Sequence, residues 1–334
     1  MSNKEPVIAI VGATGLVGSE MLAVLEQRDI PVGAVRLLAS KDSEGEVYKF
    51  RDTEAVVEEL SDSAFQEVDF ALFATSSELS QRYVPVAVDA GARVIDNSSA
   101  FRLQDDVPLV VPEVNGSLIS DGAKVIANPN CSTIQLIPVL KAVDSVARLK
   151  RVVVSTYQSV SGAGRDGLDE LWSQTLSICN QSDMPQSVFD HQIAFNCIPQ
   201  IDAIYEDGYT GEELKVINES RKILGMPDLA LTATAVRVPV FYGHAESVNI
   251  ETQRDFSMES IIEAISSCEG LELAESPSEY PMQVSCGGTD VISIGRLRRD
   301  KSVPFGLALW IVADNVRKGA ALNAIQILER MISR

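Results

Sequence analysis

The sequence has few of the residues on which several kinds of site depend. It contains only two histidines, His191 and His244, so histidine chemistry has few candidates. Its five cysteines are an odd number without a C-x-x-C pair, which indicates neither a disulfide framework nor a zinc site. We therefore expect no metal centre.

Long apolar runs and an excess of basic residues are also missing. No run of about 18 apolar residues occurs, so no membrane span is predicted. The N-terminus lacks the basic flank and longer apolar core of a signal peptide, which predicts a cytoplasmic protein. Lys and Arg number 28 against 47 Asp and Glu, a balance that argues against nucleic acid or an anionic membrane as a partner. Any site for a small anion must then be a local cluster of basic residues.

The chain does have the pattern of a nucleotide-binding domain at its start. An apolar strand is predicted over 7–11 and a helix follows through Leu25, with a G-x-x-G-x-x-G turn between them. Glycines in this context let the backbone approach a pyrophosphate at the helix N-terminus. The glycine turn is therefore the candidate site for a dinucleotide cofactor.

The second predicted strand, 34–39, bears on the choice of cofactor. It ends at Ser40, Lys41 and Asp42, where the adenosine ribose would lie. Hydroxyl and basic groups accommodate the 2′-phosphate of NADP, whereas an acid binds the free hydroxyl of NAD. Ser40 and Lys41 favour NADP, and Asp42 leaves NAD as an alternative.

The remaining patterns divide the 334 residues into two domains. Further strands over 68–73, 93–96 and 124–127 alternate with helices, which predicts a doubly wound (Rossmann-like) α/β domain with a parallel sheet. After Cys131, β-rich runs predict an α+β domain with a mainly antiparallel sheet whose apolar faces suit a homodimer. An amphipathic helix over 315–334 ends the chain. We expect a cofactor domain of residues 1–130 plus 315–334 and a catalytic and dimerisation domain of residues 131–314.

Cys131 is the first candidate for chemistry. It follows an Asn-Pro-Asn turn and directly precedes an apolar helical pattern, so its thiol lies at a helix N-terminus. The macrodipole there favours the thiolate, which is the reactive form. The alternative is a structural cysteine that happens to open a helix.

Four other stretches combine unusual residues with an ordinary explanation. Arg237 lies between valines in a strand and requires an anionic partner if buried, and His244 is either catalytic or a satisfied core histidine. The polar, glycine-rich segment 157–164 is a surface turn or a loop against a nicotinamide. Glu212 and Lys215 share one face of a helix, a pattern that usually marks a solvated surface.

Together these stretches resemble the aspartate-β-semialdehyde dehydrogenase family over almost the whole chain. The matching segments are 11–18, 97–102, 128–133, 157–164, 212–215, 237–244 and 312–319. The resemblance implies reductive dephosphorylation of L-4-aspartyl phosphate by NADPH to L-aspartate 4-semialdehyde and phosphate, in lysine (diaminopimelate), threonine and methionine biosynthesis.

The resemblance also implies a role for each candidate residue. Cys131 would be the nucleophile that forms a thioester, His244 the general acid/base, and Gln158 the residue that positions the acyl group. Arg237 and Glu212 would hold the carboxylate and amino group of the substrate. Arg102 and Lys215 would receive the phosphate. The residues that would contact the cofactor are Gly12, Thr14, Gly15, Leu16, Val17, Ser40, Lys41, Ser161, Gly162 and Asn315.

Two alternatives stay open at this point. One is another thiol-dependent acyl-phosphate reductase, such as the N-acetyl-glutamyl-phosphate type, in which Glu212 would lose its ion-pair partner because the substrate amine is acetylated. The other is a catalytically inactive paralogue that keeps the fold as a cofactor-binding module, although the joint presence of Cys131, Gln158, Arg237 and His244 counts against it.

Overall fold

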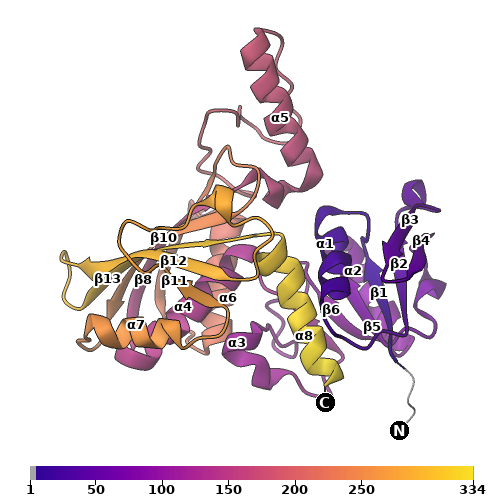
Figure 1. The fold of residues 1–334 in the computed structure, drawn as a ribbon, viewed down its shortest axis with the longest axis horizontal. Coiled ribbons are helices and arrows are strands. Elements are labelled where there is room, and N and C mark those ends of the chain that lie inside the picture. Colours follow the sequence, from indigo (N-terminus) through magenta and orange to yellow (C-terminus); the bar gives the residue numbers. More distant parts are fainter. Residues whose placement is uncertain (1–4, 334) are drawn as a thin grey trace. The chain divides into compact units, whose positions relative to one another are not determined.

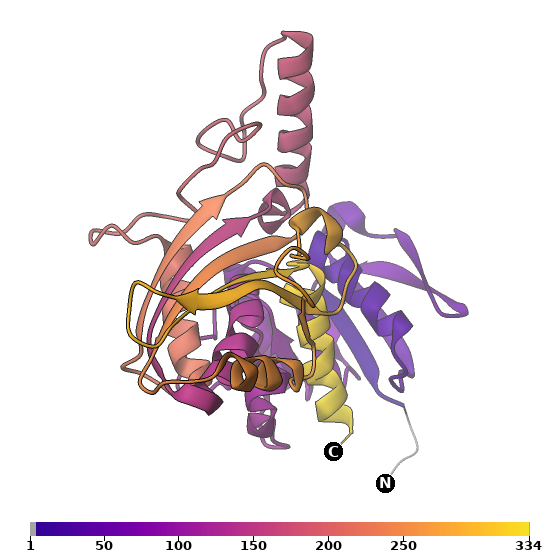
Figure 2. The same cartoon turned by 60° about the vertical axis from the view of Figure 1, so that its left-hand side comes forward.

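The protein folds into two compact units in a computed structural model that describes residues 5–333. The first unit runs to Asn130 and includes the chain from Ala320 onwards, and the second unit is Cys131–Gly319. The first division falls at the boundary expected from the sequence, and the second falls a few residues after 314. Figures 1 and 2 show the elements of each unit in two views.

The first unit contains a seven-stranded sheet in the order β3-β4-β2-β1-β5-β6-β7. Its parallel core consists of β1 (Val7–Val11), β2 (Ala34–Ala39), β5 (Phe70–Phe73), β6 (Arg93–Asp96) and β7 (Val125–Ala127). This confirms the predicted doubly wound sheet.

One hairpin of this unit was not predicted. Strand β3 (Val47–Phe50) pairs antiparallel with β4 (Thr53–Glu59), and β4 pairs parallel with β2. The hairpin lies at the sheet edge and exposes Val47 and Val56, at 56% and 52%. Charged residues interrupt its sequence, so it lacks the continuous apolar run that marks a buried parallel strand.

Helices cover both faces of the first sheet. Helix α2 (Ser77–Asp89) packs on one face, while α1 (Leu16–Gln27) and α8 (Asn323–Ile332) share a core on the other. The short helix α3 (Pro112–Asn115) completes this unit. The C-terminal helix therefore returns to the first unit, as predicted.

The predicted helix over 315–334 is wrong in its first part. A π-helix occupies Arg317–Leu322 before α8 begins. The cause is Asp314, whose carboxylate accepts hydrogen bonds from the backbone N–H of Val316 and of Arg317, while its carbonyl accepts one from Gly319 N–H. This five-residue spacing widens the turn. Arg334 lies outside the described residues.

The second unit contains a six-stranded sheet in the order β11-β12-β13-β10-β8-β9. Its strands are β8 (Leu149–Gln158), β9 (Ala230–Arg237), β10 (His244–Thr252), β11 (Leu271–Leu273), β12 (Ile292–Asp300) and β13 (Gly306–Ala313). The inner pairs are antiparallel as predicted, and the two edge pairs, β8 with β9 and β11 with β12, are parallel.

The helices of the second unit lie mostly on one face of this sheet. Helices α4 (Cys131–Ala147), α6 (Gly211–Leu224) and α7 (Met258–Ser266) cover that face, whereas α5 (Gly164–Asn180) projects from the rest of the unit (Figures 1 and 2). Helix α4 is buried along almost its whole length from Ser132 onwards. None of the helices described between residues 5 and 333 combines the length and apolarity needed to cross a bilayer.

Candidate active site

Three predicted site residues lie in one row across the sheet of the second unit. Strand β9 ends at Arg237, β8 ends at Gln158 and β10 begins at His244. Gln158 is the registered partner of both of the others. Paired residues of neighbouring strands point to the same face, so the three side chains project together. Their exposures of 7%, 2% and 0% show that the row is buried.

Helix α4 brings the thiol to this row. Cys131 is its first residue, and the next residue, Ser132, accepts a hydrogen bond of 3.0 Å from Gln158 Nε2. A Cβ atom on Gly319 would lie 3.0 Å from the Cβ of Cys131, so glycine leaves room beside the thiol. Cys131 is partly exposed although Ser132 is buried. A thiol at this position gains the stabilisation that a helix N-terminus gives to an anion.

The guanidinium of Arg237 is buried and charged. Its Nη1 donates to Ser159 O at 2.9 Å. Burial lowers the pKa of Arg237 below its ordinary value, and the negative charges of Glu212 and Cys131 oppose that shift. A Cβ atom on Gly162 would lie 2.7 Å from Arg237 Nη1 and 3.4 Å from His244 Nε2, so a glycine at this position leaves room for both side chains.

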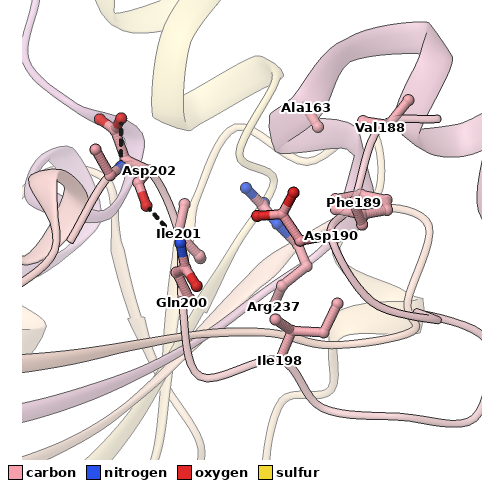
Figure 3. Close-up of a pocket in the computed structure, with 10 residues that line it drawn as sticks. Ala163, Val188, Phe189, Asp190, Ile198, Gln200, Ile201, Asp202 and Arg237 are labelled. Carbon is pink, nitrogen blue, oxygen red and sulfur yellow. Dashed lines mark hydrogen bonds between the residues drawn. The ribbon is translucent and has the colours of Figure 1, made fainter. Parts of the chain in front are cut away.

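Arg237 also lines a pocket of about 310 Å³. Its guanidinium extends into this pocket, whose other charged side chains are Asp190 and Asp202 (Figure 3). Apolar side chains, among them Phe189 and Ile198, form part of the wall. The volume lies at the small end of the range for ligand sites. Because the pocket has charged side chains of both signs, it suits a small zwitterionic ligand.

A backbone contact favours one tautomer of His244. The backbone N–H of Ser159 donates to its Nδ1 at 3.1 Å. Because a backbone N–H can only donate, Nδ1 is an acceptor, and the neutral ring carries its proton on Nε2. Burial and the charge of Arg237 lower the pKa of His244 to about 3, against opposing effects of Glu212 and of a hydrogen bond at Gly243. The described residues offer Nε2 no hydrogen-bond partner.

The predicted pair on α6 joins the same site. Glu212 is 5% exposed and accepts hydrogen bonds from Gln158 Nε2 at 3.1 Å and from Lys215 Nζ at 3.3 Å. Lys215 also donates to Asp202 at 2.9 Å. The solvated-face explanation therefore fails for Glu212. Sequence reasoning missed Asp202, which has no motif of its own, and Ser159, whose backbone N–H and Oγ both contact His244 Nδ1.

Asn315 and Ser161 form a buried network beside His244. The Asn315 side-chain oxygen accepts hydrogen bonds from Ser159 Oγ, from Ser161 Oγ and from the Gly243 backbone N–H, at 3.1, 3.1 and 2.9 Å. Asn315 Nδ2 donates to Ser161 Oγ at 3.0 Å. The network ties the 3-10 segment Val160–Ala163 to the turn before His244.

In the first unit, the glycine turn has the geometry that nucleotide binding requires. Gly12 has φ +81°, and a Cβ there would lie 2.3 Å from Ala74 O. Gly15 precedes α1 without a capping side chain, and Thr14 accepts a hydrogen bond of 3.4 Å from Ser43 Oγ. The turn thus leaves the first N–H groups of α1 without a capping side chain.

The predicted residues that follow β2 lie beside this turn. Ser43 ends the 3-10 segment Lys41–Ser43, and Ser40, Lys41 and Asp42 are exposed. Arg102, also in the first unit, is 8% exposed and donates to Asn97 O at 2.6 Å. Within residues 5–333 no cluster of His, Cys, Asp and Glu could hold a metal ion.

Comparisons with known proteins agree with both units. A family model for the NAD binding domain of semialdehyde dehydrogenases matches residues 7–122, and one for their dimerisation domain matches residues 138–318. The protein is thus an oxidoreductase with a nucleotide-binding domain and a dimerisation domain.

Individual relatives are more specific. The aspartate-semialdehyde dehydrogenase of Aquifex aeolicus is 47% identical over 97% of both chains. Aspartate-semialdehyde dehydrogenase 2 of Vibrio cholerae is also 47% identical over 97% of both chains. The crystal structure of the Vibrio cholerae enzyme II complexed with ASA has a TM-score of 0.97, with 46% identity over 99% of both chains. The chain belongs to the aspartate-semialdehyde dehydrogenase family.

Proposed function

We propose that the protein catalyses the reductive dephosphorylation of L-4-aspartyl phosphate by NADPH. The products are L-aspartate 4-semialdehyde and phosphate, on the route to lysine, threonine and methionine. The observation that carries the proposal is the buried row of Arg237, Gln158 and His244 beside Cys131 at the start of α4. The row and Cys131 together account for a nucleophile, a proton donor and a cation for the substrate carboxylate.

The proposed chemistry begins with the thiolate of Cys131. It attacks the acyl carbon, the bond to the phosphate oxygen breaks, and a thioester remains on Cys131. NADPH, if held at the glycine turn, would supply the hydride for reduction of this thioester. His244 donates from Nε2 towards the oxygen on which negative charge develops, and collapse of the thiohemiacetal returns the thiolate.

The remaining side chains hold the substrate. Arg237 binds its α-carboxylate, Glu212 its amino group, and Gln158 the acyl group that reacts. Arg102 and Lys215 receive the phosphate. An N-acetylated substrate has no ammonium to offer the buried Glu212, which would then keep Lys215 as its charged partner, and this disfavours the N-acetyl-glutamyl-phosphate alternative.

We propose NADP as the cofactor. The glycine turn fits a pyrophosphate, since the backbone at Gly12 has no room for a side chain. The residues that would hold the cofactor are Gly12, Thr14, Gly15, Leu16, Val17, Ser40, Lys41, Ser161, Gly162 and Asn315. Lys41 favours the 2′-phosphate and Asp42 opposes it. We also propose that the second unit forms a homodimer and that the enzyme is cytoplasmic.

The test is the reverse reaction. Purified protein is given aspartate semialdehyde, phosphate, and NADP⁺ or NAD⁺ in parallel, and absorbance of the reduced cofactor is followed. We expect phosphate-dependent reduction of NADP⁺. Reduction with N-acetyl-glutamate semialdehyde but not with aspartate semialdehyde would overturn the substrate, and a faster rate with NAD⁺ would overturn the cofactor.

A further inference from the structure

Asp202 has a backbone conformation that residues other than glycine seldom adopt. Its φ is +72°, in the left-handed region. Aspartate tolerates this region better than most residues, but the conformation still costs free energy. The backbone N–H of Ala203 donates to Asp202 Oδ1 at 2.9 Å, and Gln200 Nε2 donates to Asp202 O at 3.3 Å. Strain of this kind persists where the surroundings require it.

The loop that carries Asp202 is fixed at both ends. Ile198 and Arg237 exchange backbone hydrogen bonds of 2.9 and 2.8 Å, so the loop starts on the strand end that carries the proposed carboxylate site. At its other end Gly211 N–H donates to Ala203 O at 2.9 Å. A Cβ on Gly211 would lie 2.5 Å from Asp202 Oδ2, so the carboxylate packs against the first residue of α6.

The Asp202 carboxylate holds Lys215. Lys215 Nζ lies 2.9 Å from Asp202 Oδ2 and 3.3 Å from Glu212 Oε2. Glu212 in turn accepts from Gln158, so the contacts run from the loop to the buried row. The Asp202 and Lys215 side chains are 45% and 31% exposed. An ion pair this exposed adds little to stability, so the pair by itself does not explain why the left-handed backbone at Asp202 is kept.

We propose that Asp202 is a positioning residue that holds the Lys215 ammonium in place for the phosphate of the substrate. This inference rests on the proposed function, in which Lys215 receives the phosphate. A free lysine side chain loses rotamer freedom when it binds an anion, and a lysine held in advance has already lost it. Asp202 therefore tightens phosphate binding although its own charge repels phosphate.

Asp202 should tighten phosphate binding by holding Lys215 and weaken it by repelling the phosphate charge. Because these effects have opposite signs, the direction of the change in KM distinguishes them. The test measures KM for phosphate in the reverse reaction at constant ionic strength. Asp202→Asn keeps the side-chain shape and the tolerance for positive φ but removes the charge. We expect the KM of this variant for phosphate to rise by about tenfold. A tenfold change corresponds to most of the free-energy cost of fixing one lysine side chain. The KM for aspartate semialdehyde should stay within about twofold, and Asp202→Glu should recover part of the loss.

Two further variants complete the design. Asp207→Asn is the matched control, because Asp207 accepts a local hydrogen bond of 3.1 Å from Tyr209 N–H, and the KM of this variant for phosphate should be unchanged. Lys215→Ala tests the phosphate role of Lys215 separately from the positioning role of Asp202. An unchanged KM for phosphate in Lys215→Ala would refute the phosphate role of Lys215. A raised KM in Lys215→Ala, with an unchanged or lowered KM in Asp202→Asn, would overturn the role of Asp202 alone.

Discussion

The backbone N–H of Ser159 donates a hydrogen bond of 3.1 Å to Nδ1 of His244. This contact assigns the ring proton to Nε2, so the resting histidine has no lone pair there with which to take a proton from a thiol. A resting thiolate must then be stabilised by the N-terminus of α4 and by the nearby Arg237 charge. In the proposed mechanism, His244 would first act as a donor and would become a base only after it has given up its proton.

The ring should therefore stay neutral, with its proton on Nε2, from pH 8 to about pH 4, because the pKa of His244 is lowered to about 3. Nitrogen-15 NMR of the His191→Gln variant observes this ring alone, since the chain has two histidines. A titration midpoint between pH 6 and 7, or a proton on Nδ1, would contradict the assignment.

Cys131→Ala should abolish turnover while cofactor affinity stays within about twofold, because the glycine turn belongs to the first unit and the thiol to the second. The reverse-reaction assay and a cofactor-binding titration measure the two quantities. Cys197→Ala is the matched control, as that thiol is exposed, and it should retain full activity. Turnover near the wild-type rate in Cys131→Ala would remove Cys131 as the nucleophile.

Arg237→Ala should weaken transition-state binding by about 2–5 kcal/mol, as for one partner removed from a buried charge pair. Arg237→Lys should recover only part of kcat/KM, because lysine keeps the charge without the planar fork that binds a carboxylate with two hydrogen bonds. Kinetics with aspartate semialdehyde measure both effects. Arg165→Ala is the control, because Arg165 is exposed and directly follows segment 157–164. An unchanged kcat/KM in Arg237→Ala would refute the carboxylate role.

Glu246 predicts a pH dependence of stability. It follows His244 by two residues on β10, it is fully buried, and its carboxyl oxygens have no hydrogen-bond partner among the described residues. Burial raises the pKa of Glu246 well above 4.5, and the nearby Gln135 amide offsets only part of this shift.

Above pH 4.5 the folded protein thus keeps a proton that the unfolded chain releases, so this carboxyl lowers stability as pH rises. Glu246→Gln removes that dependence and should raise Tm at pH 8, with the difference shrinking towards pH 4.5. Thermal unfolding at the two pH values measures the effect. A lower Tm for the variant at pH 8 would show that Glu246 is charged and paired.

The sequence predicted what depends on local patterns. The parallel strands, the glycine turn and the position of Cys131 at a helix start follow from apolar periodicity and from glycine and proline placement. The contact between Glu212 and Gln158 joins residues far apart in the chain, and no local pattern distinguishes Glu212 from a solvated glutamate. The Ser159 contact uses a backbone group that every residue except proline has. The π-helix depends on side-chain hydrogen bonds of Asp314, which periodicity does not register.

The row of Arg237, Gln158 and His244 has a consequence for how folding of this enzyme is measured. The three residues share a face only while three strands keep their pairing, and a slip of one residue in any strand would turn its member to the opposite face. Recovered activity after refolding therefore counts the molecules whose strands are correctly aligned. Spectroscopic signals of sheet content would count the misaligned molecules as well, so the difference between the two yields measures strand misalignment directly.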